Sequence, residues 1–421
     1  MDPHRKFEIR CPVHGFITLN DWEREIIGQP AFQRLRRIRQ LAWTDQIYPG
    51  AMHNRFEHSL GVMHTATLLY DAIIRNSEEF LTSELGYDKD GLRRNRQLVR
   101  LAALLHDVGH SPFSHASEEL FPDSENGPKH THEQYSAAIV RGPLKNAIED
   151  HNLNRRNLAL KADDIASLLE GSPAARHGLF WRDLIDGQMD ADRMDYLLRD
   201  SHHTGVHYGK FDLNRLINTV RVGMNADSPQ IGVEYGGWHA AEALVMARYL
   251  MFTQVYFHQT RVAFDIHLRE TMRDLLPGGH FPKPSELNEF LGWDDWKVLG
   301  LLSDGKGGEH GKRLASREHY RLIFHTNEIQ REEDRTILSR LREHLGAFLV
   351  AEMPAGKSWY KLDKTDITVF SGAGPKKVVP LSFHSNVVKN LGKSDQVLLY
   401  CRPEQKDLAR KKVRELTDGL E

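Results

Sequence analysis

The chain has 421 residues, of which 40% are hydrophobic, and its 56 Lys and Arg against 58 Asp and Glu give a formal net charge of −2. This balance excludes a uniformly basic nucleic-acid-binding protein, so any attraction for polyanions must come from local clusters. Cys11 and Cys401 are too far apart in sequence for a disulfide framework or a zinc ribbon, and no stretch approaches the ~20 apolar residues of a membrane span. We therefore expect a cytoplasmic protein without a membrane contact.

The N-terminal part of the sequence predicts a mainly α fold. Residues 9–20 alternate like a short strand, and residues 21–41 predict a helix that is interrupted near Gly28 and Pro30. In the helices that follow, apolar residues recur every three or four positions, which turns one face of each helix towards a core. These helices are expected at residues 59–76, 95–109, 132–142, 162–171, 189–201 and 237–276.

Residues 276–284, LPGGHFPKP, interrupt the helical pattern and mark the predicted domain boundary. We expect a helical core at residues 1–275 and a smaller α+β C-terminal lobe at residues 276–421 that packs on the core and takes part in assembly. Within the lobe, residues 303–313 predict a flexible, glycine-rich loop. The other elements expected there are helices at residues 331–345 and 406–420 and strands at residues 367–372, 377–383 and 396–402.

Histidine is concentrated in one early segment, where eight of the 24 histidines stand between residues 53 and 132. His106 and Asp107 end the apolar run in RLAALLHDVGH, and such a pair at the end of a buried helix would present two metal ligands to a cleft. His58 lies upstream in HNRFEHSLGV, and Asp192 lies downstream in DADRMDYLLRD. Two imidazoles and two carboxylates suit a divalent Mn, Fe, Mg, Co or Zn ion. The alternative is a buried polar network without a metal.

These residues form an ordered H…HD…D pattern that resembles the HD-domain phosphohydrolases. The resemblance extends to the deoxynucleoside triphosphate triphosphohydrolase (dNTPase) branch, in particular to the catalytic core of the mammalian dNTPases with a sterile alpha motif and an HD domain, and to their bacterial relatives. Four ordered motifs are a specific signal, whereas a lone HD dipeptide is not. The matching segments are residues 32–62, 104–115, 131–134 and 190–205, with a weaker match at residues 396–416 to the closing strand and helix of the family.

The resemblance implies an HD-domain helical core that hydrolyses a deoxynucleoside triphosphate (dNTP) to a deoxynucleoside and tripolyphosphate, by attack of water on the α-phosphorus. His58, His106, Asp107 and Asp192 would hold the divalent metal, and an additional Mg²⁺ would accompany the triphosphate. A metal suits this reaction because it acidifies water and neutralises phosphate oxygens.

The 5′ oxygen of the nucleoside is a poor leaving group, so the reaction needs a positioned acid, for which imidazole is the usual choice near neutral pH. By motif match the candidates are His110 and His132, with Glu118 or Glu133 to orient an imidazole and raise its pKa. Position 118 departs from the family pattern, which has aspartate there.

The predicted helix at residues 189–201 places Asp192, Tyr196 and Asp200 four residues apart on one face, with Arg193 at its border. The resemblance assigns Arg193 to phosphate, Tyr196 to sugar and phosphate, and Asp200 to the sugar 3′-hydroxyl. The alternative is a solvated helix face. The same resemblance assigns phosphate contacts to Arg55, His115 and Arg248, packing on the deoxyribose to Tyr256, and contacts to base and sugar to Gln40 and Leu41.

The resemblance also implies a homo-oligomer, a dimer-based tetramer or hexamer, with a nucleotide activator or inhibitor at the subunit interfaces. Basic residues around the FQRLR segment serve such sites in the family, and Arg34, Arg36 and Arg37 are present here. At the preceding turn the family has an acidic residue, but this chain has Gly28, which argues against guanine-specific activation. The process served would be nucleotide homeostasis or antiviral defence, and nucleic acid would be a secondary partner.

Two other functions fit parts of the pattern. An HD phosphodiesterase or nuclease would keep the fold but act on cyclic dinucleotides or single-stranded nucleic acid. A nucleotide-sensing assembly protein would bind nucleotides with only weak catalysis, although the complete H…HD…D set argues against an inactive enzyme. Product analysis separates these functions, because only a dNTPase releases deoxynucleoside and tripolyphosphate.

Overall fold

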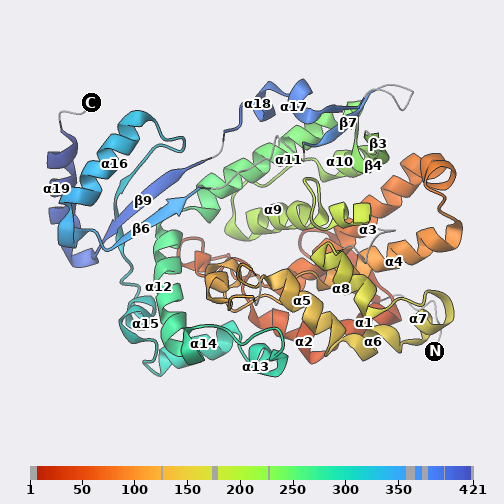
Figure 1. Cartoon of the computed structure of the whole chain (residues 1–421), viewed down its shortest axis with the longest axis horizontal. Coiled ribbons are helices and arrows are strands. Elements are labelled where there is room, and N and C mark those ends of the chain that lie inside the picture. Colours follow the sequence, from red (N-terminus) through yellow and green to blue (C-terminus); the bar gives the residue numbers. More distant parts are fainter. Residues whose placement is uncertain are drawn as a thin grey trace.

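Figure 1 shows the computed structural model of the chain, and helices dominate it, which confirms the predicted mainly α fold. Among the residues that it describes, no helix is long and apolar enough to cross a membrane. The described residues are 7–124, 127–172, 179–225, 228–356, 366–371, 378–392 and 394–418.

The N-terminal segment forms a hairpin rather than the single strand that its alternation predicted. β1 (Phe7–Cys11) pairs antiparallel with β2 (Gly15–Leu19). In the turn between them Gly15 has φ +77°, a value that residues with a Cβ rarely adopt. Asn20 then begins α1 (Asp21–Ile27) with a capping box.

The predicted interruption near Gly28 and Pro30 is confirmed. α1 ends before Gly28, and α2 (Pro30–Gln33) begins at the proline, whose missing N–H has no helical partner at that position anyway. The chain continues as a single 3₁₀ turn, η1 (Arg34–Arg37), and is extended at Ile38.

Two long helices form the centre of the fold. α3 (Arg55–Glu79) packs against α4 (Lys89–Leu105) and, on another side, against α9 (Ala191–Thr204). Leu101 of α4 and Met194 of α9 are fully buried in the hydrophobic core that the three helices share. The helices arranged around this centre are α5 (His132–Arg141), α6 (Lys145–Glu149), α7 (Asn152–Asn157), α8 (Ala162–Glu170) and α10 (Leu213–Thr219).

The single long helix predicted at residues 237–276 is wrong. α11 (Trp238–Met251) runs into one π turn, η8 (Phe252–Tyr256), and α12 (Gln259–Leu275) then starts afresh. The side chain of His258 accepts a hydrogen bond from the Thr260 N–H and so caps α12. The apolar pattern continues through the break, because Phe252, Val255 and Tyr256 of the π turn are buried.

One small sheet, drawn in blue at one end of Figure 1, forms a separate layer near the C-terminus. Its central strand β9 (Gln396–Cys401) pairs antiparallel with β5 (Arg321–His325) and β6 (Ala351–Ala355). α16 (Glu332–His344) and α19 (Lys406–Thr417) pack on it around a core of their own.

The other two predicted C-terminal strands belong to a different sheet. β7 (Thr368–Phe370) and β8 (Val378–Pro380) extend the hairpin of β3 (Val220–Asn225) and β4 (Ser228–Glu234) in the order β3-β4-β7-β8. They lead into α17 (Leu381–His384) and α18 (Asn386–Lys389), which lie over α11 in Figure 1. The chain therefore contributes β5, α16 and β6 to the small sheet, returns to the main body as β7 and β8, and comes back to the small sheet as β9 and α19.

The main hydrophobic core continues beyond residue 275. Phe281 belongs to it, as do Phe290 of α13 (Leu287–Leu291) and Val298 of α14 (Asp295–Ser303). The domain boundary at residue 275 stays a prediction, and the packing is continuous across it.

The glycine-rich segment at residues 303–313 is not the flexible loop that its composition predicted, because half of it belongs to α15 (Gly308–Ala315). Gly307 and Gly308 take φ +87° and +62° and turn the chain into the helix. A Cβ on Gly308 would overlap with the Asp274 carboxylate of α12. These glycines therefore allow close packing rather than mobility.

Candidate metal centre and substrate cavity

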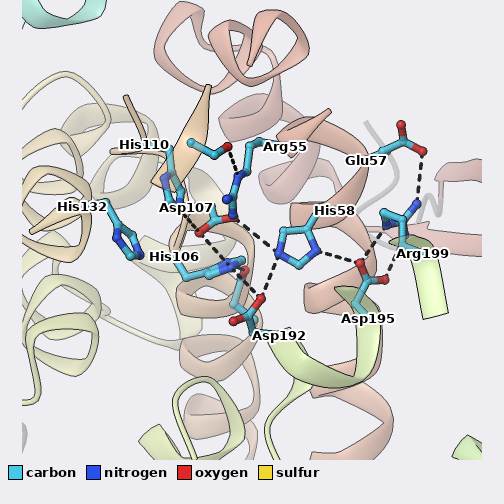
Figure 2. Close-up of polar contacts among 12 residues, drawn as sticks. Arg55, Glu57, His58, His106, Asp107, His110, His132, Asp192, Asp195 and Arg199 are labelled. Carbon is cyan, nitrogen blue, oxygen red and sulfur yellow. Dashed lines mark hydrogen bonds and ion pairs between the residues drawn. The ribbon is translucent and has the colours of Figure 1, made fainter. Parts of the chain in front are cut away.

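The four predicted metal ligands come together at one point (Figure 2). His58 lies on the first turn of α3, His106 and Asp107 follow α4, and Asp192 lies on the first turn of α9. His58 Nε2 is 3.0 Å from Asp192 Oδ1 and 3.4 Å from Asp107 Oδ2. His106 Nε2 is 3.2 Å from Asp107 Oδ1 and 3.7 Å from Asp192 Oδ1. Three distant segments thus supply two imidazoles and two carboxylates.

Each imidazole is oriented by a hydrogen bond at its other nitrogen. His58 Nδ1 donates to Asp195 Oδ2 at 2.8 Å, and His106 Nδ1 donates to the Ala103 carbonyl at 2.8 Å. Since a carboxylate and a carbonyl only accept, both Nδ1 atoms carry the hydrogen and both Nε2 atoms present a lone pair.

The two Nε2 atoms are buried and make no well-directed hydrogen bond, although His58 Nε2 lies 3.0 Å from Asp192 Oδ1. Leaving such a group unsatisfied costs about 1–3 kcal/mol. A divalent cation between the imidazoles of His58 and His106 and the neighbouring carboxylates would satisfy both nitrogens, so the residues present fit a divalent metal.

The charges of this cluster favour a cation as well. Burial lowers the pKa of His58, but the carboxylates of Asp192, Asp195 and Asp107 outweigh that effect and raise it to about 10. Burial raises the pKa of Asp107, but Arg55 above all holds it well below its usual range. The cluster therefore takes up a proton on His58 when no other cation is present, and a metal would replace that proton.

The four predicted acid–base residues form a second cluster beside the first. Glu118, on the 3₁₀ helix η4 (Ser114–Leu120), lies 2.8 Å from His132 Nδ1 and 3.4 Å from His110 Nδ1 through its Oε1 atom. The rings of His110 and His132 stack with their centroids 4.1 Å apart. Glu133 is more distant, with Oε1 3.5 Å from His132 Nε2. His110 also connects the clusters, because its Nε2 is 3.1 Å from Asp107 Oδ1.

The two stacked imidazoles differ in protonation. Burial lowers the pKa of His132, but the Glu118 carboxylate outweighs it and raises the pKa to about 9. Burial, assisted by the charges of Arg55 and His132, holds the pKa of His110 well below its usual range. At neutral pH the pair therefore consists of a protonated His132 and a neutral His110. The glutamate at position 118, where the family pattern has aspartate, still reaches His132.

Both clusters face a cavity of about 560 Å³, a volume in the usual range for small-molecule sites. His58 and His110 are buried behind its wall, with no exposed surface. Every other predicted site residue lines it: Gln40, Leu41, Arg55, His106, Asp107, His115, Glu118, His132, Glu133, Asp192, Arg193, Tyr196, Asp200, Arg248 and Tyr256.

Five arginines line this cavity. Arg55, Arg193 and Arg248 were predicted, and Arg182 and Arg261 were not. Guanidinium groups match pairs of phosphate oxygens, so the cavity suits a polyanion. In this structure Arg55 contacts the candidate metal ligand Asp107, since its Nη1 lies 2.5 Å from Asp107 Oδ2, and its Nε donates to Ser114 Oγ at 2.8 Å.

Asp200 is held between two donors. The Tyr256 hydroxyl donates to its Oδ2 at 2.6 Å, and His53 Nε2 donates to its Oδ1 at 2.7 Å. Burial and the adjacent carboxylate raise the pKa of Tyr256 well above its usual range, so the phenol stays protonated. His53 was noted in the sequence only as one of the clustered histidines, and its contact with Asp200 could not be inferred from its position.

The predicted basic residues near the FQRLR segment differ in accessibility. Arg34 is 1% exposed, and its guanidinium donates to the carbonyls of Trp293 and His110 at 2.7–2.9 Å. It is therefore unavailable to a nucleotide at a subunit surface. Arg37 pairs with Asp294 at 2.5 Å, and Arg36 lies over the Phe56 ring at 3.5 Å.

Comparisons with known proteins agree with the motif order. Residues 55–200 match the HD domain family, and residues 211–347 match the HD associated region. The uncharacterized protein YwfO of Bacillus subtilis is 35% identical over 264 residues, which are 62% of this chain and 54% of that protein. The human deoxynucleoside triphosphate triphosphohydrolase SAMHD1 is 34% identical over 235 residues, 51% of this chain and 36% of that protein. The chain spans about half the length, or less, of these curated relatives.

A solved structure of a hypothetical protein from Aquifex aeolicus is similar over nearly the whole chain. The TM-score is 0.80 at 28% sequence identity, with 97% of this chain and 100% of that chain covered. The similarity therefore includes the C-terminal layer as well as the helical centre.

Proposed function

Because the chain is an HD-domain protein, as its motifs predicted, and an HD-associated region follows the HD domain, we propose that it is a metal-dependent nucleotide phosphohydrolase. More narrowly, we propose that it hydrolyses dNTPs to deoxynucleoside and tripolyphosphate. The observation that carries this proposal is the convergence of His58, His106, Asp107 and Asp192 beside a cavity lined by five arginines. The similarity to mammalian and other triphosphohydrolases supports the substrate class.

In this proposal the four clustered residues hold one divalent ion, which supplies an acidified water and neutralises phosphate oxygens. Mn, Fe, Mg, Co and Zn all suit two imidazoles and two carboxylates. An additional Mg²⁺ would enter with the triphosphate.

Arginine side chains would orient the substrate. Arg55, Arg193 and Arg248 would hold the triphosphate, with His115 at the open edge of the cavity, where its side chain is 61% exposed. Because Arg55 contacts Asp107, a phosphate held by Arg55 would lie next to the proposed metal site. In this proposal that phosphate is the one nearest the sugar, and water attacks its phosphorus.

The stacked histidines would supply the proton for the leaving group. His132 carries the proton at neutral pH because Glu118 raises its pKa to about 9. The neutral His110 would be connected to His132 through Glu118, whose Oε1 lies 3.4 Å from His110 Nδ1 and 2.8 Å from His132 Nδ1. His132 is therefore the proposed acid, Glu118 its orienting partner and His110 a relay, while Glu133 has a lesser share because of its longer distance.

At the sugar end, Asp200 would accept a hydrogen bond from the 3′-hydroxyl, and Tyr196 would contact sugar and phosphate. Tyr256 donates a hydrogen bond to Asp200, so in this proposal it would lie beside the sugar and exclude a 2′-hydroxyl. Gln40 and Leu41 would contact base and sugar. Together these residues would select 2′-deoxynucleotides.

Product identification tests the proposal against its alternatives. The purified chain would be incubated with Mn²⁺ or Mg²⁺ and each dNTP, singly and mixed, or with a cyclic dinucleotide or single-stranded DNA. We expect deoxynucleoside and tripolyphosphate from dNTPs. Cleavage of the cyclic dinucleotide or DNA with intact dNTPs would support an HD phosphodiesterase, and nucleotide-dependent assembly with little turnover would support a sensor.

The same experiment addresses regulation and assembly. We propose a homo-oligomer that a nucleotide activates at its subunit interfaces, in line with the similarity to the human triphosphohydrolase. Turnover in mixtures only, with a concurrent increase in oligomer size, is the expected result for an activator. Equal turnover of single and mixed dNTPs would contradict activation.

A further inference from the structure

Asp195 is a fully buried carboxylate that orients His58, one of the four proposed metal ligands (Figure 2). It accepts four hydrogen bonds. Its Oδ2 accepts from His58 Nδ1 at 2.8 Å and from Arg199 Nε at 2.8 Å. Its Oδ1 accepts from Arg199 Nη2 at 2.9 Å and from His14 Nε2 at 2.6 Å. The four hydrogen bonds therefore fill the acceptor sites of the carboxylate and fix its orientation.

His14 comes from far outside the HD domain. It stands at the turn between β1 and β2, 181 residues before Asp195, and its side chain is 4% exposed. Because a carboxylate only accepts, His14 Nε2 is the donor in this hydrogen bond. We propose that His14 is a positioning residue of the metal centre, which fixes the Asp195 carboxylate and through it the orientation of His58.

The packing around Asp195 supports a dedicated arrangement. Gly61 lies on α3 one turn beyond His58, and a Cβ at this position would overlap with Asp195 Oδ1 and Arg199 Nη2. The glycine thus leaves the space that the carboxylate and the guanidinium occupy. Arg199 is anchored in turn by Glu57, whose Oε2 lies 3.2 Å from Arg199 Nη1.

Loss of the His14 donor would leave Asp195 Oδ1 with Arg199 as its remaining partner. The carboxylate could then turn away from His58, and the Nε2 lone pair of His58 would no longer be directed at the metal. Groups that orient metal-binding histidines typically contribute about 10–100-fold to metal affinity. The N-terminal hairpin is therefore part of the metal centre rather than an appendage.

The test is the dissociation constant for Mn²⁺ of the full chain, measured by calorimetric titration, with the visible spectrum of the Co²⁺-loaded protein as a second readout. His14→Phe keeps a ring but removes the donor, and His14→Gln keeps a donor of similar reach. We expect His14→Phe to weaken Mn²⁺ binding about 10–100-fold and to change the Co²⁺ spectrum. We expect His14→Gln to stay close to the wild type.

His64→Phe is the matched control, because its ring lies 5.2 Å from that of His14 but it is not one of the four donors to Asp195. It should bind Mn²⁺ like the wild type. Wild-type affinity in His14→Phe, or equal weakening in His14→Phe and His14→Gln, would overturn the proposal.

If His14→Phe does not fold, His14→Asn replaces it in the test. Its side chain carries a donor but is too short to reach Asp195. It should bind Mn²⁺ more weakly than His14→Gln, and equal affinities would overturn the proposal. The inference rests on the metal centre of the proposed function but not on its substrate. If dNTPs are not hydrolysed while the Mn²⁺ affinities differ as expected, the proposed substrate fails and the role of His14 stands.

Discussion

Asp295 Oδ1 accepts a hydrogen bond at 2.8 Å from the backbone N–H of Phe113, so the HD-associated region holds the loop between His110 and His115. Its Oδ2 accepts another at 2.9 Å from the N–H of Arg39, next to Gln40. Phe113 and Ser114 have φ of +59° and +57°, the left-handed region that non-glycine residues seldom adopt. The buried carboxylate stabilises this strained turn and joins two edges of the cavity.

Substitution of Asp295 should therefore affect turnover more than metal binding. Asp295→Asn keeps the size but directs an amide N–H at one of the two backbone donors, which then loses its acceptor at a cost of about 1–3 kcal/mol. We expect a lower kcat, a lower free energy of unfolding and unchanged Mn²⁺ content. Kinetics with dNTP, urea unfolding and metal analysis check these values. Asp304→Asn, at an exposed position directly after α14, is the control, and a wild-type kcat in Asp295→Asn would contradict the role.

The pH dependence of kcat should report the Glu118–His132 pair. The proposed acid must be protonated, so kcat should fall as the pH rises through the pKa of His132, about 9. Glu118→Gln removes the charge that raises this pKa, so the alkaline limb should shift to lower pH. Glu119→Gln is the control, because Glu119 pairs with Arg269 at 2.5 Å and does not line the cavity. An alkaline limb that stays in place in Glu118→Gln would exclude His132 as the acid.

Sugar selectivity should depend on the bulk of Tyr256. Tyr256→Ala opens the space beside Asp200, so the preference in kcat/KM for dGTP over GTP should shrink about 10-fold or more. Tyr256→Phe keeps the ring and should keep the preference, although it removes the 2.6 Å hydrogen bond to Asp200. Steady-state kinetics with both nucleotides measure the ratio. Equal ratios in Tyr256→Ala and the wild type would place the selectivity elsewhere.

Glu23 and Arg100 form a buried ion pair whose loss should destabilise the fold. Arg100 Nε lies 2.6 Å from Glu23 Oε1, and Glu23 is fully buried. Glu23→Gln leaves Arg100 without its counter-charge, which should lower the free energy of unfolding by about 3–5 kcal/mol at pH 7. Glu25→Gln, at an exposed position of the same helix, should have little effect. Chemical unfolding checks both variants, and equal stabilities would contradict the expectation.

The destabilisation by Glu23→Gln should also depend on pH. Burial raises the pKa of Glu23, but the Arg100 guanidinium outweighs it, and the net pKa lies below the usual 4.5. The ion pair therefore contributes stability above pH 4.5 and loses it as the pH falls through the lowered pKa of the folded state. The difference between wild type and Glu23→Gln should shrink over that range, and a constant difference would contradict it.

The sequence alone predicted that His58, His106, Asp107 and Asp192 lie together because they stand in short, recognisable segments. His106 and Asp107 are adjacent at the end of an apolar helix, and Asp192 begins a helix with a regular polar face. Such local order survives folding. The supporting residues carry no local signal: His14 is one of 24 histidines and reaches Asp195 across 181 residues.

The fold departed from prediction where long-range packing decides the local structure. At the break, Phe252, Val255 and Tyr256 are apolar or aromatic and buried, so the sequence pattern gave no sign that the helix ends there. Gly307 and Gly308 lead the chain into α15 and pack closely against α12. Composition alone cannot distinguish such a packed turn from a mobile loop. Strand pairing was equally hidden, since β7 and β9 look alike in sequence but join different sheets.

The most direct test of the account is hydrolysis of a dNTP in ¹⁸O-labelled water, with mass spectrometry of both products. Attack of water on the α-phosphorus beside His58, His106, Asp107 and Asp192 predicts one ¹⁸O in tripolyphosphate and none in the deoxynucleoside. Label in the deoxynucleoside, or a deoxynucleoside monophosphate with pyrophosphate as products, would contradict the account.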